Sequence, residues 1–148
     1  MYLDSLGQQI ESRLKSGTIG KAVFVRAHLQ LTADHGLLLP LAAEGLELAQ
    51  RWIATPVHAV YPLGGVPQGF INLMVDFSGG EAALITAELT LGGEAVTQLL
   101  ITGQHGSLRL DEYPEPSQLT DLTGNGQRWL RGITTALATG RQMITVRE

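Results

Sequence analysis

The first fourteen residues carry an amphipathic pattern. Leu3, Leu6, Ile10 and Leu14 recur at intervals of three and four residues, which is typical of a helix with one apolar side. Gly17 follows the pattern and suits the left-handed conformation that ends many helices. The sequence therefore opens with a helix that stops just before Gly17.

Residues 21–33, KAVFVRAHLQLTA, alternate between two kinds of side chain, as a strand does when its two faces meet different surroundings. One face is apolar and consists of Val23, Val25, Ala27, Leu29 and Leu31. The other face is mixed and consists of Phe24, Arg26, His28 and Gln30. The pattern predicts a long strand with one buried face.

The helical spacing returns between Gly36 and Trp52, in GLLLPLAAEGLELAQRW. Pro40 fits the first turn of a helix, where its missing N–H group is not needed. One apolar stripe follows and consists of Leu41, Gly45, Leu48, Ala49 and Trp52. Pro56 ends this second helix.

The rest of the chain is rich in alternating runs that glycine-containing turns separate. Such runs predict strands joined by tight turns, as in an antiparallel meander. Five strands are expected, in VHAVYPL, GFINLMVDF, EAALITAELTL, EAVTQLLIT and SLRLDEY. A loop over residues 113–125, an amphipathic helix in GQRWLRGITTALATG and a short final strand in QMITVR complete the chain.

This order of elements predicts an α+β fold over one domain, residues 1–148: an open-faced, mostly antiparallel sheet with the helices on one face. The other face would gather mixed side chains from three strands. They are Phe24, Arg26, His28, Gln30, Phe70, Asn72, Met74, Asp76, Leu84, Thr86, Glu88 and Thr90. It is either a solvated face or a subunit interface or ligand wall. We favour the interface or ligand wall over the solvated face, because a contiguous patch of Phe, Met and Leu beside Arg and His is unfavourable in water.

Composition narrows the classes of function. The chain has 148 residues, 44% of them hydrophobic, a formal net charge of −4 and no basic run, so nucleic acid and anionic membranes are not expected as main partners. It has no cysteine, which excludes disulfides and thiolate metal sites and fits a reducing, cytoplasmic setting. No apolar run is long enough to span a bilayer, and the N-terminus is not a signal peptide.

The candidate polar residues do not assemble into a metal or nucleophile motif. The four histidines are scattered, so a metal site is not expected. Arg26 and His28 lie two residues apart on one strand and point the same way. With Glu88 or Asp76 from neighbouring strands they could form an ion-pair cluster, for which we favour subunit contact over catalysis.

Four segments together resemble a known family. LKSGTIGKAVFVRA, FINLMVDFSGGEAALITAE, LLITGQHGSLRLDEY and WLRGITTALATGRQMITV follow the order of motifs in the C-terminal domain of the glucose–fructose oxidoreductase/inositol dehydrogenase (Gfo/Idh/MocA) family, with Met143 where proline is usual. The resemblance runs from Leu3 to Val146. It implies a dihydrodipicolinate-reductase-like C-terminal domain.

In that family a preceding Rossmann domain binds NAD(P) and carries the catalytic lysine. This chain has no strand–Gly-x-Gly-x-x-Gly–helix unit, and its nearest glycine cluster, GGVPQG at residues 64–69, opens no helix. We therefore expect no cofactor site in this chain. Binding of NAD(P) is expected only if a partner or a missing domain supplies its site.

The family also has an Asp-x-x-x-His pair on the second helix, and the resemblance implies that its His exchanges a proton with the substrate hydroxyl. An ungapped alignment places Pro40 and Glu44 at these two positions. Glu44 is then either a surface glutamate or a polar anchor in a vestigial pocket. His35 is either an ordinary loop histidine or a ligand residue on the substrate side.

Two functions remain open. The chain is a stand-alone, non-catalytic domain that self-associates as a homodimer or larger, or binds a small polar ligand or a Rossmann-type partner subunit. The alternative is the substrate and oligomerisation half of a split or truncated NAD(P)-dependent sugar or polyol oxidoreductase. Met1 at the start of the domain favours a short natural protein, although a cloned fragment begins the same way.

Overall fold

A computed structural model of the chain describes residues 2–32, 37–90, 92–114, 126–140 and 143–144. The helices are α1 (Tyr2–Lys15), α2 (Leu38–Trp52), the short 3₁₀ turn η2 (Val66–Gln68) and α4 (Gln127–Thr139). The strands are β1 (Ala22–Leu31), β2 (Val57–Gly65), β3 (Phe70–Phe77), β4 (Ala82–Leu89), β5 (Val96–Gly103), β6 (Ser107–Glu112) and β7 (Met143–Ile144). This order matches the one that the sequence predicts.

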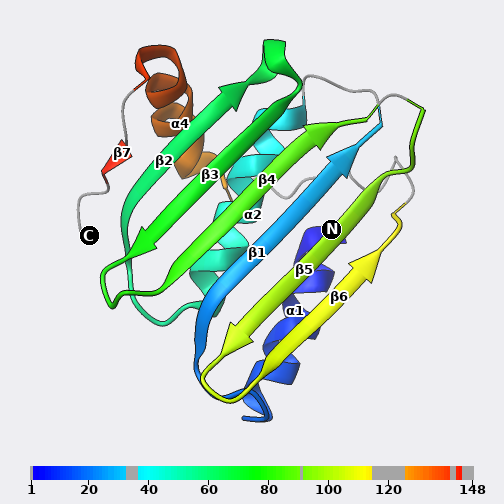
Figure 1. Cartoon of the computed structure of the whole chain (residues 1–148), viewed down its shortest axis with the longest axis vertical. Coiled ribbons are helices and arrows are strands. Elements are labelled where there is room, and N and C mark those ends of the chain that lie inside the picture. The colour runs from blue at the N-terminus through cyan, green and yellow to red at the C-terminus, as the bar shows by residue number, and fades with distance from the viewer. Residues whose placement is uncertain (1, 33–36, 91, 115–125, 141–142, 145–148) are drawn as a thin grey trace.

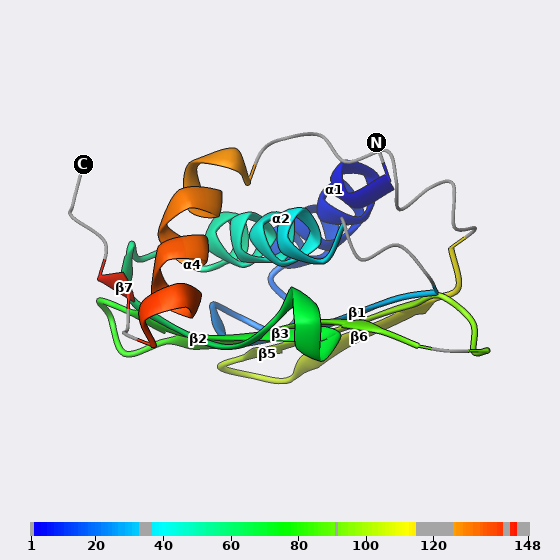
Figure 2. The same ribbon diagram turned by 90° about the horizontal axis from the view of Figure 1, so that it is seen from above.

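One sheet holds all seven strands, in the order β6-β5-β1-β4-β3-β2-β7. Only β1 and β4 run parallel, and every other neighbouring pair is antiparallel. Figure 1 looks onto the sheet with α1, α2 and α4 behind it, and Figure 2 shows the three helices together on one side. The predicted α+β fold, an open-faced sheet with helices on one face, is therefore confirmed.

The predicted meander is wrong at one place. The turn at Gly92–Gly93 does not join two paired strands, because β1 lies between β4 and β5 and pairs with both. Adjacency in the chain does not decide adjacency in the sheet when a strand from elsewhere satisfies the same backbone groups. In this sheet β1, which comes early in the chain, forms the backbone hydrogen bonds along one edge of β4 and one edge of β5.

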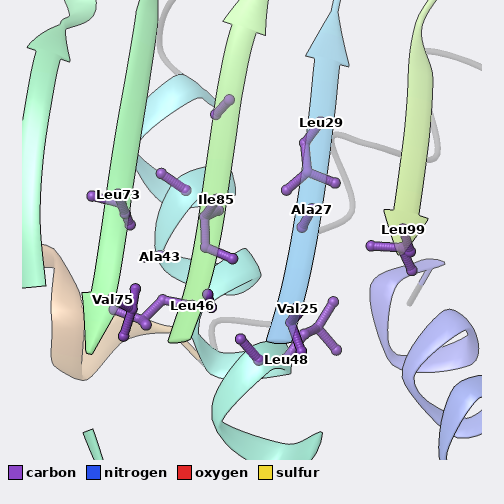
Figure 3. Close-up of a cluster of buried hydrophobic side chains, with 14 of the residues drawn as sticks. Val25, Ala27, Leu29, Ala43, Leu46, Leu48, Leu73, Val75, Ile85 and Leu99 are labelled. Carbon is purple, nitrogen blue, oxygen red and sulfur yellow. The ribbon is translucent and has the colours of Figure 1, made fainter. Parts of the chain in front are cut away.

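The core lies between the sheet and the helices, with α2 across the middle strands (Figure 3). Val25, Ala27 and Leu29 of β1 are fully buried there, as their alternation predicts. The prediction for Val23 is wrong: a break in the register between Ala22 and Phe24 moves Ala22 into the core and leaves Val23 half-buried. Such a bulge shifts the facing of residues before it.

The helix ends follow the sequence signals. The backbone N–H of Gly17 donates to Leu14 at 3.1 Å with φ +77°, and Gly140 ends α4 with φ +68°. In the first turn of α2, Pro40 occupies the third position. Among the described residues no helix combines the length and the apolar character needed to cross a bilayer.

Candidate functional site

The uncovered face is the side of the sheet on which no described helix lies (Figure 2). The strand register arranges it in rows, because residues directly opposite on paired strands point to the same side. The central row crosses six strands and consists of Arg109, Leu100, Arg26, Leu84, Met74 and Tyr61. The neighbouring row consists of Asp111, Gln98, His28, Thr86, Asn72 and Leu63.

The predicted members of this face are brought together. β1, β4 and β3 are neighbours, so Arg26, His28, Met74 and Glu88 share one surface, as predicted. Thr90 lies just past the end of β4, where its N–H donates to Leu31 at 2.8 Å. Alternation with a period of two identifies these residues from the sequence alone.

Large apolar side chains are exposed on the uncovered face. Leu63 is 65% exposed, Met74 45% and Tyr61 39%, and all three lie on the adjacent strands β2 and β3. The sequence predicts Met74 on this face but assigns no facing to Tyr61 or Leu63. The register Tyr61↔Met74 and Leu63↔Asn72 places them there.

One predicted ion pair forms on this face. His28 Nε2 lies 2.6 Å from Glu88 Oε1 across the parallel β1–β4 pair, and both side chains are partly buried. The neighbouring Thr86 hydroxyl donates to Asn72 Oδ1 at 2.7 Å. These contacts join β1, β4 and β3 through side chains as well as through the backbone.

Arg26 and Asp76 differ from this pair, because the side chain of neither forms a hydrogen bond or an ion pair with any residue that the structure describes. Arg26 borders a hollow of about 120 Å³ beside Leu100. The remaining polar lining of the hollow is Gln98, Arg109 and Asp111, and Arg109 Nε lies 3.3 Å from Asp111 Oδ2. An unpaired guanidinium at the rim of a hollow is available to a ligand or a second protein.

Glu44 lies away from the uncovered face, in the layer of helices. Its side chain is only 3% exposed, and its Oε1 accepts a hydrogen bond of 3.2 Å from the backbone N–H of Gly126, at the start of α4. A carboxylate at a helix N-terminus is favourable because the free N–H groups and the helix dipole attract negative charge. The expectation of a surface glutamate is wrong, because α4 covers this side of α2.

Gly126 fits this place because it has no side chain. A Cβ atom there would lie 2.5 Å from the backbone C and O atoms of Ala43 and 2.7 Å from the N atom of Glu44. The start of α4 therefore lies directly against the backbone of α2. The indole Nε1 of Trp129 adds a hydrogen bond of 3.0 Å to Glu47.

A wider groove opens beside Pro40, between the start of α2, η2 and α4. Its volume is about 610 Å³. The lining is mostly apolar and consists of Leu39, Pro40, Val66, Leu130, Arg131, Thr134 and Thr135. Pro40, which the ungapped alignment pairs with the family's Asp, borders this groove, whereas Glu44 does not line it.

A third polar cluster lies where β3 turns into β4. Glu81 is buried, accepts a hydrogen bond of 2.8 Å from the Thr55 hydroxyl, and has Lys21 Nζ 3.5 Å from its other oxygen. The hydrogen bonds from Thr55 and from its own backbone hold the pKa of Glu81 below its ordinary value, and Lys21 adds to this effect. The cluster ties this turn to the end of α2 and to the start of β1.

This lowered pKa predicts acid sensitivity. The ionised Glu81 stabilises the fold fully above the ordinary carboxyl pKa of 4.5, and the contribution is lost as the pH falls through the lower pKa of the folded state. Glu81→Gln should therefore lower the urea midpoint at pH 7, and this difference from the parent should shrink at pH 3. An equal difference in urea midpoint between variant and parent at pH 7 and at pH 3 would contradict the stabilising role of the ionised Glu81.

The other histidines do not join a site. His35 lies outside the described residues. His58 borders a shallow hollow with Asp76 and Glu81, and the His105 ring packs against Gly20. Among the residues that the structure describes, no three His, Asp or Glu side chains are grouped closely enough to hold a metal ion.

No family model matches the chain, and no curated protein is similar to it in sequence. Solved structures match it in fold. Myo-inositol 2-dehydrogenase from Lactobacillus plantarum superposes with a TM-score of 0.75 at 10% identity, over 99% of this chain and 64% of its own. Scyllo-inositol dehydrogenase from Lactobacillus casei, solved with NAD(H) and scyllo-inositol, gives 0.74 at 9% identity, over 97% and 63%. Myo-inositol dehydrogenase from Corynebacterium glutamicum gives 0.72 at 12% identity, over 96% and 62%.

These likenesses establish the fold. The chain has the fold of one domain of the inositol dehydrogenases, and the resemblance to the Gfo/Idh/MocA C-terminal domain is confirmed at that level. The chain spans less than two thirds of the length of these enzymes. Their activity and their cofactor belong to longer chains.

Proposed function

We propose that this chain is a non-catalytic domain of the Gfo/Idh/MocA C-terminal type that associates with a second copy through the uncovered face. The observation that carries the proposal is the exposure of Tyr61, Leu63 and Met74 side by side on that face. A contiguous exposed patch of large apolar side chains, rimmed by polar residues, is typical of a protein–protein interface. Tyr61 itself and Arg26, which lies on the far side of β4, are of residue types that are enriched in protein interfaces.

The size of the face suits such an interface. A standard interface buries about 800 Å² on each partner, which is about a tenth of the 7583 Å² that this chain exposes. Six long strands contribute residues to the uncovered face, so one layer of side chains can supply this area. At roughly 25 cal/mol for each Å² of apolar surface, the exposed side chains of β2 and β3 alone contribute several kcal/mol.

The surroundings of Glu44 support a scaffold role. A general base must reach a substrate proton, whereas the Glu44 carboxylate is buried beneath α4 and holds the N–H of Gly126. The residue at the position of the family's proton-transfer His thus stabilises the contact between two helices. We infer that the helix kept its packing while this position changed its role.

A charge on the uncovered face tests the association. Leu63→Glu should convert the dimer to monomer, because the single two-fold interface would then bury two carboxylates in place of two exposed leucines. Sedimentation velocity measures the change. Gln9→Glu on the exposed side of α1 adds the same charge on the opposite side of the molecule and should leave the dimer intact. A parent chain that sediments as a monomer at micromolar concentration would refute the proposed function.

A second function rests on the groove beside Pro40. Its apolar lining at the start of α2 favours contact with a separate dinucleotide-binding subunit, in which case this chain supplies the substrate half of a split oxidoreductase. The chain alone should not bind NADH or NADPH, and titration followed by nicotinamide fluorescence checks this. Saturable micromolar binding would contradict both functions as stated.

A further inference from the structure

The uncovered face differs on the two sides of β4. On one side, β1, β5 and β6 carry Arg26 and Arg109 with the hollow between them. On the other side, β3 and β2 contain no lysine or arginine and carry Asp76 and the exposed Tyr61. The first half carries Arg26 and Arg109 against one carboxylate, Asp111, and is the basic half, whereas the second carries the unpaired Asp76 among apolar side chains and is the acidic half.

In the aligned class of sheet packing, two sheets lie face to face about 10 Å apart with their strands within about 30° of each other. A two-fold axis between them runs either across the strands or along them. An axis across the strands places each strand over itself, so that Arg26 meets the basic half of the partner. An axis along the strands places the basic half of each copy over the acidic half of the other, which electrostatic complementarity favours.

We propose that two copies pack about a two-fold axis that runs along β4 in front of Leu84, with Tyr61 of each copy seated in the hollow between Arg26 and Arg109 of the other. This geometry rests on the proposed function, because it requires that the uncovered face bind a second copy. It adds the orientation of the two copies and the contacts that select it.

The central row makes this pairing self-complementary. Leu84 lies at its middle, on β4. Leu100 is two strands away on one side and Tyr61 is two strands away on the other. Rotation about the axis therefore places Tyr61 over the partner's Leu100, where the hollow of about 120 Å³ opens. The flanking guanidinium groups can contact the ring face, an arrangement that arginine and tyrosine favour.

The same rotation pairs the unpaired charges. Arg26 and Met74 lie in the central row, one strand to either side of Leu84, so Arg26 falls over the partner's Met74. Asp76 lies two residues further along the same strand as Met74, about 7 Å away, which is within reach of an arginine side chain. Each dimer then holds two Arg26–Asp76 pairs.

Charge exchange tests this contact. Arg26→Asp and Asp76→Arg should each raise the dimer dissociation constant at least about tenfold, because each homodimer then opposes like charges twice. A mixture of the two variants should form heterodimers with close to the parent affinity, since both contacts become Asp–Arg pairs. Native mass spectrometry counts the species. Homodimers and heterodimers in statistical proportion would overturn the orientation, while the association itself would stand.

The axis is tested separately by cross-linking, because the chain has no cysteine of its own. Leu84→Cys places the thiols of the two copies on the axis, and a short bismaleimide should link them in high yield. Thr102→Cys on β5 is the control, since its two copies lie about four strand spacings, or about 19 Å, apart. A link at position 102 and none at position 84, in a chain that still dimerises, would overturn the axis. A monomeric parent would refute the proposed function as well.

Discussion

Gly126→Ala should destabilise the fold by about 3 kcal/mol, at the upper end of the effects of overpacking. The added methyl group would lie 2.5 Å from the carbonyl of Ala43, within the backbone of α2. A backbone inside a helix cannot rotate away as a flexible side chain can, so α4 must shift. The hydrogen bond from Gly126 to Glu44 would then weaken as well. Urea denaturation followed by tryptophan fluorescence measures the loss.

The same substitution at Gly7 is a matched control. Gly7 lies within α1, and a Cβ there would meet only the outer atoms of the Leu48 and Arg51 side chains, at 3.0 Å. Those side chains can move, and alanine favours the helix over glycine by about 1 kcal/mol. Gly7→Ala should therefore leave the midpoint nearly unchanged or raise it. A loss of stability in Gly7→Ala equal to that in Gly126→Ala would contradict the role of the α2–α4 contact.

Glu44→Ala should lower the free energy of unfolding by about 3 kcal/mol. The substitution leaves a cavity beneath α4 and removes the acceptor of a buried N–H group, and each effect costs about 1–3 kcal/mol in comparable settings. Glu44→Gln keeps the size and the acceptor oxygen and should cost about 1 kcal/mol, chiefly through the lost charge at the helix N-terminus. Urea denaturation at pH 7 compares the two variants.

The comparison separates a structural role from a catalytic one. A glutamate that serves only as a residual proton acceptor would tolerate both substitutions without loss of stability. An unchanged urea midpoint in Glu44→Ala would therefore remove the main support for the scaffold interpretation. The expected order of stability is the parent, then Glu44→Gln, then Glu44→Ala.

Local patterns were sufficient for most of the elements. The spacing of Leu3, Leu6 and Ile10 identified α1, and glycine at 17 and 140 marked the helix ends, because these signals depend only on neighbours in the chain. The facing of Arg26 and Met74 followed from a period of two in the same way. The α+β class follows from the order of the elements.

Contacts between distant segments could not be predicted in this way. Glu44 and Gly126 are 82 residues apart, and nothing beside Glu44 in the sequence indicates that another helix covers it. The place of β1 between β4 and β5 has the same cause, since several strands could have satisfied its backbone groups. The facing of Tyr61 and Leu63 was not predictable either, because residues 59–63 are all apolar and the register break between Val57 and Ala59 changes the alternation along β2.

The central position of β1 also sets an order of events during folding. Its two neighbours are β4 and β5, and the His28–Glu88 contact alone spans 60 residues. The hairpin of β2 and β3 needs only local closure, whereas β1 must wait until the chain beyond it has been made and has turned back. Pairing over such separations slows folding, so the last step is expected to be the insertion of the strand that was synthesised first. Until then, β1 and its apolar side chains are free to pair with another molecule. A chaperone that binds residues 22–31 during this interval should raise the yield of folded protein.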